Sequence, residues 1–145
     1  MHPREAILTD RTGVAIFDIR SHSSTQHSDL FKLSHPSLQV RERVYIHKQH
    51  EKSPYHHFVA TSNNIFLLDQ RFPSHPVLKW THLLISPPVY MDIIYNITAR
   101  DGCSDDVVLL GCQDYPECHA FQLSLGLGSL HPYWNGLPWR ISKPR

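Results

Sequence analysis

The chain has 145 residues, 41% of them hydrophobic and 19% charged, and its 14 Lys and Arg against 13 Asp and Glu give a formal charge of +1. This size and composition fit one ordinary globular domain and exclude a disordered chain. The charge balance also excludes an indiscriminate nucleic-acid binder, because such binding needs a strong basic excess to neutralise phosphates. No apolar run reaches the length of a membrane span, and the opening residues MHPREAILTDRTG lack the apolar stretch of a secretory signal.

Short segments rich in Val, Ile, Leu, Phe and Tyr alternate with 11 scattered Pro and 6 Gly residues. Such breakers argue against long helices, and the segments between them carry the composition of strands. The sequence therefore predicts an all-β fold. Its three cysteines, Cys103, Cys112 and Cys118, are an odd number, which indicates reduced thiols of the cytosol or nucleus rather than a secreted disulfide framework.

The first predicted element is a hairpin at residues 5–20, EAILTDRTGVAIFDIR, which turns at DRTG. A polar, flexible loop, SHSSTQHSD, is expected at residues 21–29. The segment QVRERVYIH at residues 39–47 then alternates well enough to form a single intervening strand.

A second hairpin is predicted at residues 57–71, HFVATSNNIFLLDQR, with its turn at SNN. Gly and Asn in these turns are expected to supply the positive φ that hairpin turns demand. PVLKWTH at residues 76–82 would lead from one structural repeat toward the next, with Trp80 in the core. A weaker third hairpin is predicted at residues 106–125, and residues 126–145 form a Pro- and Trp-containing connector.

The hairpins form an internal repeat. The second strands of the first two end in hydrophobic-Asp-x-Arg, at Asp18 and Asp69, which are 51 residues apart (69 − 18 = 51). In the third hairpin Gln122 takes this place. A hairpin that recurs every ~40–50 residues is typical of β-propeller blades. Residues 1–125 are therefore predicted to form a partial WD40-like β-propeller of about two to three blades; an unrelated β-sandwich or barrel is the alternative.

Propellers typically close with about four to eight blades, so we expect this chain to be a fragment of a larger propeller. The two aspartates are expected to be structural residues at the ends of their blades. There, Asp18 and Asp69 would cap turns or accept hydrogen bonds from the backbone.

Twelve histidines raise the question of a metal site. Structural zinc sites pair their ligands in tight knuckles, and the order Cys103, Cys112, Cys118, His119 does not fit that spacing. Catalytic signatures such as G-x-S-x-G, H-E-x-x-H or a phosphate-binding glycine loop do not occur either. The sequence therefore predicts a protein without a metal, a cofactor or catalytic residues, although a metal-binding β-protein stays open as an alternative.

Candidate interaction residues lie in the connector, HPYWNGLPWRISKPR. Trp134, Trp139 and Arg140 belong to residue types that anchor protein interfaces. Packing of both tryptophans against the rim of the propeller is the alternative.

Residues 59–88, VATSNNIFLLDQRFPSHPVLKWTHLLISPP, resemble the WD-like region of the C-type TATA-box-binding-protein-associated factor of RNA polymerase I. LLDQRFP, the following PVLKW-x-H segment and the double proline carry the resemblance. VVLLG and FQLSL in the third hairpin are also compatible with it.

The resemblance implies a non-catalytic scaffold subunit of the promoter selectivity factor for ribosomal RNA genes. Its partners would be the TATA-binding protein, other selectivity-factor subunits and the RNA polymerase I machinery. It would reach rRNA promoter DNA only through the complex and would work in the nucleus and nucleolus, away from membranes. A WD-repeat adaptor in another complex is the alternative.

Overall fold

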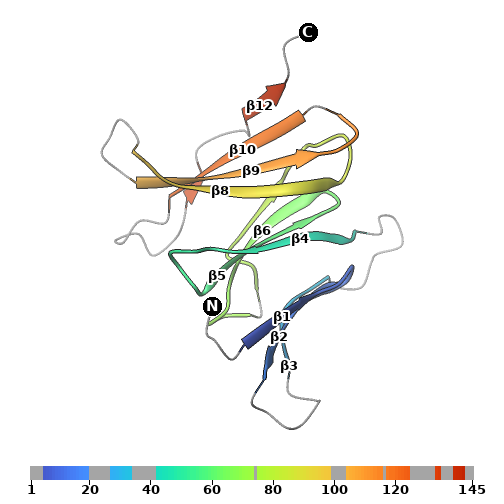
Figure 1. The fold of residues 1–145 in the computed structure, drawn as a ribbon, viewed down its shortest axis with the longest axis vertical. Coiled ribbons are helices and arrows are strands. Elements are labelled where there is room, and N and C mark those ends of the chain that lie inside the picture. The colour runs from blue at the N-terminus through green and yellow to red at the C-terminus, as the bar shows by residue number, and fades with distance from the viewer. Residues whose placement is uncertain are drawn as a thin grey trace. The chain divides into compact units, whose positions relative to one another are not determined.

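The computed structural model describes residues 5–19, 27–33, 42–73, 75–98, 104–115, 117–124, 133–134 and 139–142. Across these residues every regular element is a β-strand, and the strands form three open antiparallel sheets (Figure 1). The all-β prediction is confirmed. The same residues accordingly contain no helix long and apolar enough to cross a membrane.

The sheets follow one another along the chain. The first has the order β1-β2-β3, the second β4-β5-β6-β7, and the third β11-β10-β9-β8 with β12 also paired to β10. The chain divides into two compact units, Met1–Trp80 and Thr81–Arg145. The strands are β1 Glu5–Thr9, β2 Gly13–Asp18, β3 His27–Lys32, β4 Val44–Gln49, β5 His56–Thr61, β6 Asn64–Asp69, β7 Leu78–Thr81, β8 Pro88–Thr98, β9 Ser104–Cys112, β10 Glu117–Ser124, β11 Tyr133–Trp134 and β12 Trp139–Ser142.

The first two predicted hairpins have the same register. Glu5 pairs with Asp18 at the open end of β1–β2, and His56 pairs with Asp69 at the open end of β5–β6. Both members of the second pair lie 51 residues after their counterparts (56 − 5 and 69 − 18). The offset read from the sequence is therefore a register match between two hairpins.

The third hairpin is β9–β10, in which Val107 pairs with Gln122. Val107 lies 51 residues after His56 (107 − 56), whereas Gln122 lies 53 after Asp69 (122 − 69). The difference of two residues falls in the longer connection between the strands. The third copy keeps the hairpin and lengthens its turn.

Neither tight turn uses the expected positive φ. Among the described non-glycine residues only Leu83 has one, at 57°. In the first turn the Asp10 carboxylate instead accepts hydrogen bonds from the backbone N–H groups of Thr12 (2.6 Å) and Gly13 (2.9 Å). Gly13 is needed for space, because a Cβ there would run into the carbonyl oxygen of Phe31 on the adjacent strand. The prediction of the turns was right, but its physical reason was wrong.

A side chain also closes the second turn. The Thr61 hydroxyl accepts a hydrogen bond from the Asn64 backbone N–H (3.0 Å), and the Asn64 side-chain amide donates to Glu42 (2.6 Å). Glu42 comes from the segment just before β4. The turn is thus tied to the strand next to its own hairpin.

Two boundary expectations were wrong. The PVLKWTH segment does not leave its sheet, because β7 pairs with the outer edge of β6 and the N–H of Val77 donates to the carbonyl of Leu67 (2.8 Å). The polar loop expected at residues 21–29 ends early, because β3 begins at His27 and pairs with β2. In both places strand pairing satisfies backbone groups that an open sheet edge would leave to solvent. The expected core position of Trp80 is confirmed, since this side chain is only 7% exposed.

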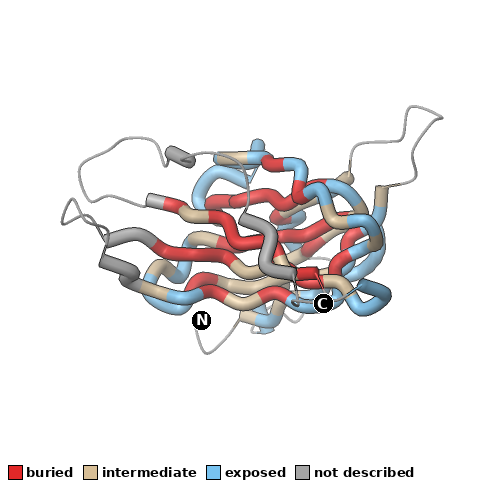
Figure 2. The backbone as a smooth tube through the Cα atoms, turned by 90° about the horizontal axis from the view of Figure 1, so that it is seen from above, coloured by how far each residue is buried: buried red, intermediate tan, exposed pale blue. Residues whose placement is uncertain are grey.

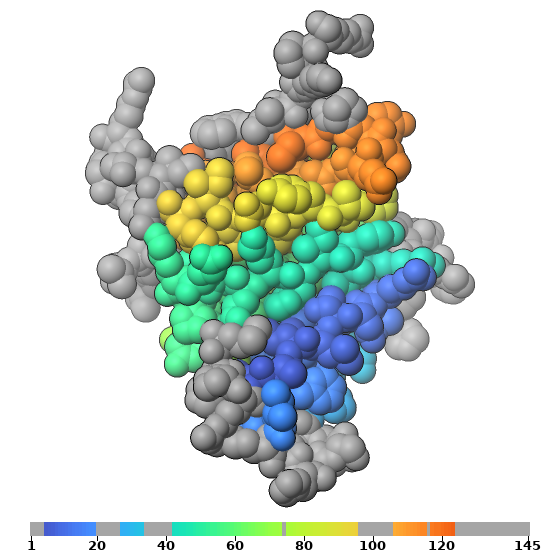
Figure 3. Space-filling model, viewed as in Figure 1, coloured from blue at the N-terminus to red at the C-terminus, as the bar shows by residue number. Residues whose placement is uncertain are grey.

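The core of the first unit joins its two sheets. Val14 and Ile16 of β2 and Leu30 of β3 cluster with side chains of the second sheet, namely Val44, Val59, Phe66 and Leu68. In Figure 3 the β1 surface accordingly lies along β4, and the two strands are in contact. The alternate side chains of β5 and β6, Phe58, Ala60, Ile65 and Leu67, are all 0% exposed. These two central strands are therefore buried on both faces, and buried positions lie along the strands in Figure 2.

The sheet of the second unit centres on β9 and β10. β11 and β12 both pair with β10, with Trp134 opposite Leu123 and Trp139 opposite Ala120. The segment expected to be a connector thus contributes two short strands. The division of the chain at residue 125 stays a prediction.

Candidate interaction surface

Asp69 stands where the fully buried strand β6 ends. Its side chain is 7% exposed and accepts hydrogen bonds from the backbone N–H (2.9 Å) and the Nε (3.0 Å) of Arg71 at Oδ1, and from the Arg71 Nη2 (2.7 Å) at Oδ2. The hydrogen bonds from the Arg71 side chain lower the pKa of Asp69. The carboxylate therefore closes the turn after β6 and holds the guanidinium in one orientation.

Asp18, the partner of Asp69 in the repeat, has a different environment. It ends β2 in the same register but is exposed, and the residue that would correspond to Arg71, Arg20, lies outside the described residues. The blade-end role assigned to the two aspartates stays a prediction.

Arg71 also lies against two aromatic rings. Its guanidinium carbon is 5.0 Å from the centroid of the Tyr55 ring and 5.8 Å from that of Phe72. Tyr55 is 49% exposed and Phe72 69% exposed. Cation–π contact at such distances contributes about 0.5–1 kcal/mol when exposed. We call these three residues the Tyr55–Arg71–Phe72 cluster.

The cluster has the chemistry of a protein-contact surface. Tyr and Arg are enriched among the residues that dominate binding energy at interfaces. Arg71 is already oriented by Asp69, so less side-chain freedom is lost when a partner binds. Sequence reasoning missed the cluster, because Tyr55 belongs to the turn before β5 and lies far along the chain from Arg71; the only signal was the Arg-Phe pair that follows Leu-Asp.

A histidine pair lies behind the cluster in the same sheet. His47 Nε2 is 3.0 Å from His57 Nδ1, and the two rings stack with centroids 5.3 Å apart. On its other side His57 Nε2 is 3.3 Å from Gln70 Oε1. Burial lowers the pKa of His47 to about 4 and also lowers the pKa of His57. At neutral pH both rings are therefore uncharged, and the pair acts as buried polar packing.

The described histidines and cysteines do not assemble into a metal site. No group of three or more His, Cys, Asp or Glu among the described residues could hold a metal ion. His119 Nδ1 bonds instead to the carbonyl of His82, and its Nε2 is 3.0 Å from Glu117 Oε1. Cys112 and Cys118 are free thiols, and burial raises the pKa of Cys118. Cys103 lies outside the described residues.

The residues proposed for interaction in the C-terminal segment are placed only by their backbone. Trp134 lies in β11, and Trp139 and Arg140 lie in β12, with Arg140 opposite His119. Their side chains are outside what the structure describes. Their role at an interface stays a prediction, and nothing brings them together with the Tyr55–Arg71–Phe72 cluster.

Comparison with known proteins finds three similar mammalian chains. The mouse C-type TATA box-binding protein-associated factor of RNA polymerase I is 34% identical over 92 residues, which is 61% of this chain and 11% of the mouse protein. The rat protein of that name gives the same values, and the human one is 38% identical over 93 residues, 59% of this chain and 11% of its own length. The chain thus spans about a tenth of the length of these relatives.

No protein-family model matches the chain. No solved structure matches it either. The resemblance inferred from the sequence is confirmed by the relatives alone: over about three fifths of its length, this chain is similar to the C-type TATA box-binding protein-associated factor of RNA polymerase I.

Proposed function

We propose that this chain is part of a non-catalytic scaffold subunit of the RNA polymerase I pre-initiation machinery and supports the initiation of rRNA gene transcription. The observation that carries the proposal is its similarity, at 34–38% identity, to the mouse, rat and human factors. The name of those proteins associates them with the TATA box-binding protein and RNA polymerase I. The same comparison favours a nuclear protein, and we extend this to the nucleolus.

We further propose that the sheets are blades of a WD-type β-propeller. The matched register of β1–β2 and β5–β6 supports a repeating unit, and the four-stranded order β4-β5-β6-β7 is that of a propeller blade. Burial of β5 and β6 on both faces supports the same arrangement, because stacked repeats cover each other's faces. In an open two-layer sandwich one face of each sheet would stay solvated.

In this proposal the scaffold contacts proteins, and DNA is reached only through the complex. The near-neutral charge of the chain favours protein partners over an independent grip on phosphates. The Tyr55–Arg71–Phe72 cluster supplies the exposed aromatic and cationic groups for one such contact. The partners proposed are the TATA-binding protein, other selectivity-factor subunits and RNA polymerase I.

The test is affinity purification of the tagged chain from nuclear extract, read by mass spectrometry. We expect the TATA-binding protein and polymerase I factors to co-purify, and the double variant Tyr55→Ala/Phe72→Ala to lose at least one of them. The matched control, Ile85→Ala/Tyr115→Ala, removes two apolar side chains that are 63% and 47% exposed elsewhere and should retain all partners. A different stable set of partners would refute the polymerase I role in favour of a WD-repeat adaptor in another complex.

A further inference from the structure

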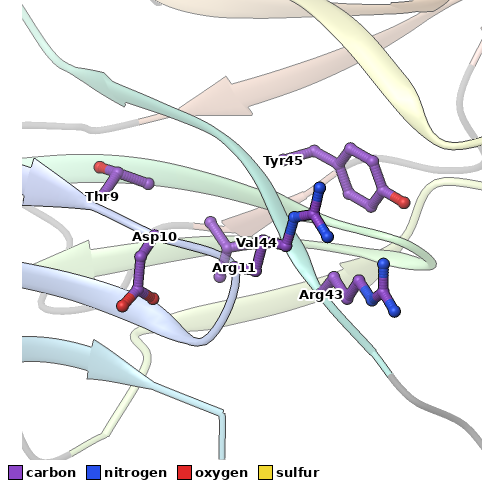
Figure 4. A pocket seen from close by; sticks show the side chains of 6 residues that line it. All are labelled: Thr9, Asp10, Arg11, Arg43, Val44 and Tyr45. Atoms are coloured by element: carbon purple, nitrogen blue, oxygen red, sulfur yellow. The ribbon is translucent and has the colours of Figure 1, made fainter.

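A concave pocket opens beside the first hairpin turn in the first unit. It has a volume of about 360 Å³ and is lined by Thr9, Asp10, Arg11, Arg43, Val44 and Tyr45. These residues come from the β1–β2 turn and from the start of β4. Figure 4 shows the two guanidinium groups and the Tyr45 hydroxyl on one side of the pocket, while the Asp10 carboxylate points away from them.

Hydrogen bonds fix the backbone on both sides of this pocket. The Arg11 carbonyl accepts from the N–H of Val44 (3.0 Å), which joins the turn to β4. The Arg43 carbonyl accepts from the N–H of Ser62 (2.9 Å), and the Arg43 N–H donates to the Ser62 hydroxyl (3.0 Å). The two arginines are therefore carried on segments that are tied to the sheets, so the site exists before a ligand binds.

The two guanidinium groups are available to a ligand. Both arginines are exposed, and within the described part of the chain neither side chain has an ion-pair partner. The acids beside them are engaged elsewhere. Asp10 bonds to the hydroxyl and N–H of Thr12 and the N–H of Gly13, contacts that lower its pKa, and Glu42 bonds to Asn64.

We propose that this pocket binds the phosphoryl group of a phosphorylated serine or threonine in a protein partner. A phosphoryl group carries about −1.5 to −2 charges and three acceptor oxygens, which matches two guanidinium forks and a hydroxyl. A carboxylate carries one charge and needs only one fork. A nucleic-acid backbone would need a track of cations along its phosphates, whereas this site is a single concavity in a chain of formal charge +1.

The inference does not depend on which complex contains the chain. Binding is measured by fluorescence polarisation at physiological ionic strength, with a labelled peptide pool that holds a central phosphoserine between randomised positions. The unphosphorylated pool and a random-sequence DNA duplex are the comparison probes. Arg11→Gln and Arg43→Gln remove one guanidinium each, and Lys79→Gln removes an exposed cation outside the pocket.

We expect the phosphorylated pool alone to bind, each arginine variant to bind about tenfold more weakly, and Lys79→Gln to bind like the natural chain. Equal binding of both peptide pools, or unchanged binding by the arginine variants, overturns the proposal. Binding of duplex DNA that is lost in both arginine variants, without binding of phosphopeptide, overturns it in favour of nucleic-acid phosphates.

A second measurement keeps the proposal testable if an arginine variant fails to fold. O-phospho-L-serine is titrated into the isotope-labelled natural chain, and the Nε–Hε NMR signals of its arginines are followed. The signals of Arg11 and Arg43 should shift with phosphoserine and not with serine, while Arg71, already bonded to Asp69, should not respond. Unmoved Arg11 and Arg43 signals overturn the proposal.

Discussion

Replacing Asp69 by Ala should destabilise the chain by about 1–3 kcal/mol. The variant loses the charge-assisted hydrogen bond from the backbone N–H of Arg71, a type of contact that contributes roughly 1.5–3 kcal/mol. The bonds from the Arg71 side chain add little, about 0–1 kcal/mol, because that side chain is 53% exposed. Some of this loss is recovered, since water can reach the freed guanidinium.

The repeat supplies a matched control in Asp18→Ala. Asp18 occupies the same register position at the end of β2 but is exposed, so its removal should change stability by less than about 0.5 kcal/mol. Urea unfolding followed by far-ultraviolet circular dichroism gives both values from the shift in midpoint at constant slope. Equal midpoint shifts for the two variants would refute the reasoning, because burial would then not decide what the aspartate contributes.

A double-mutant cycle separates the backbone contact from the ion pair. Arg71→Ala leaves the backbone N–H bond to Asp69 in place and removes only the guanidinium. We expect a coupling energy near 0.5–1 kcal/mol between the two side chains, smaller than the total cost of Asp69→Ala. A coupling energy equal to that total cost would contradict the assignment of the larger part to the backbone.

The other predictions concern space and protonation. Gly13→Ala should lower stability by about 1–3 kcal/mol in urea unfolding, because its Cβ would run into the backbone of β3, whereas Gly111→Ala, whose nearest contact would be 3.6 Å, should be neutral or slightly stabilising. Stability should fall by about 1–3 kcal/mol as the pH drops from 6.5 to about 4, since unfolded His47 takes up a proton over this range and folded His47 does not. His47→Gln should flatten that dependence, and an unchanged profile would show that the buried pair with His57 is not its source.

The hairpins could be predicted from the sequence because the signals that specify them are local. Alternating apolar runs around DRTG and SNN place both tight turns correctly, and Val44–Gln49 lies where a single strand was expected. The environment of Asp69 could not be predicted in this way. The sequence shows hydrophobic-Asp-x-Arg twice, but whether the aspartate is buried depends on what covers the strand before it.

The edge strands and the pocket were missed for a related reason. β7 and β3 form because a neighbouring strand offers unpaired backbone groups, which neither composition nor periodicity records. Arg11 and Arg43 look like ordinary exposed residues until the hydrogen bond from Val44 to the first turn brings their segments together. Tertiary contacts of this kind leave no trace in local sequence.

The repeat itself explains why its copies have diverged. Where β5 and β6 are buried on both faces, the chain leaves the sheet through a turn in which the Asp69 carbonyl accepts from the N–H of Phe72 and the Tyr55 carbonyl from that of Gln70. An acceptor that can satisfy a further N–H is most valuable at such a buried exit. β2 is half-buried and its final Asp18 is exposed, so water can serve there. The strength with which each copy retains the aspartate should therefore follow the burial of its second strand, which makes Asp69 the position where the motif is least replaceable.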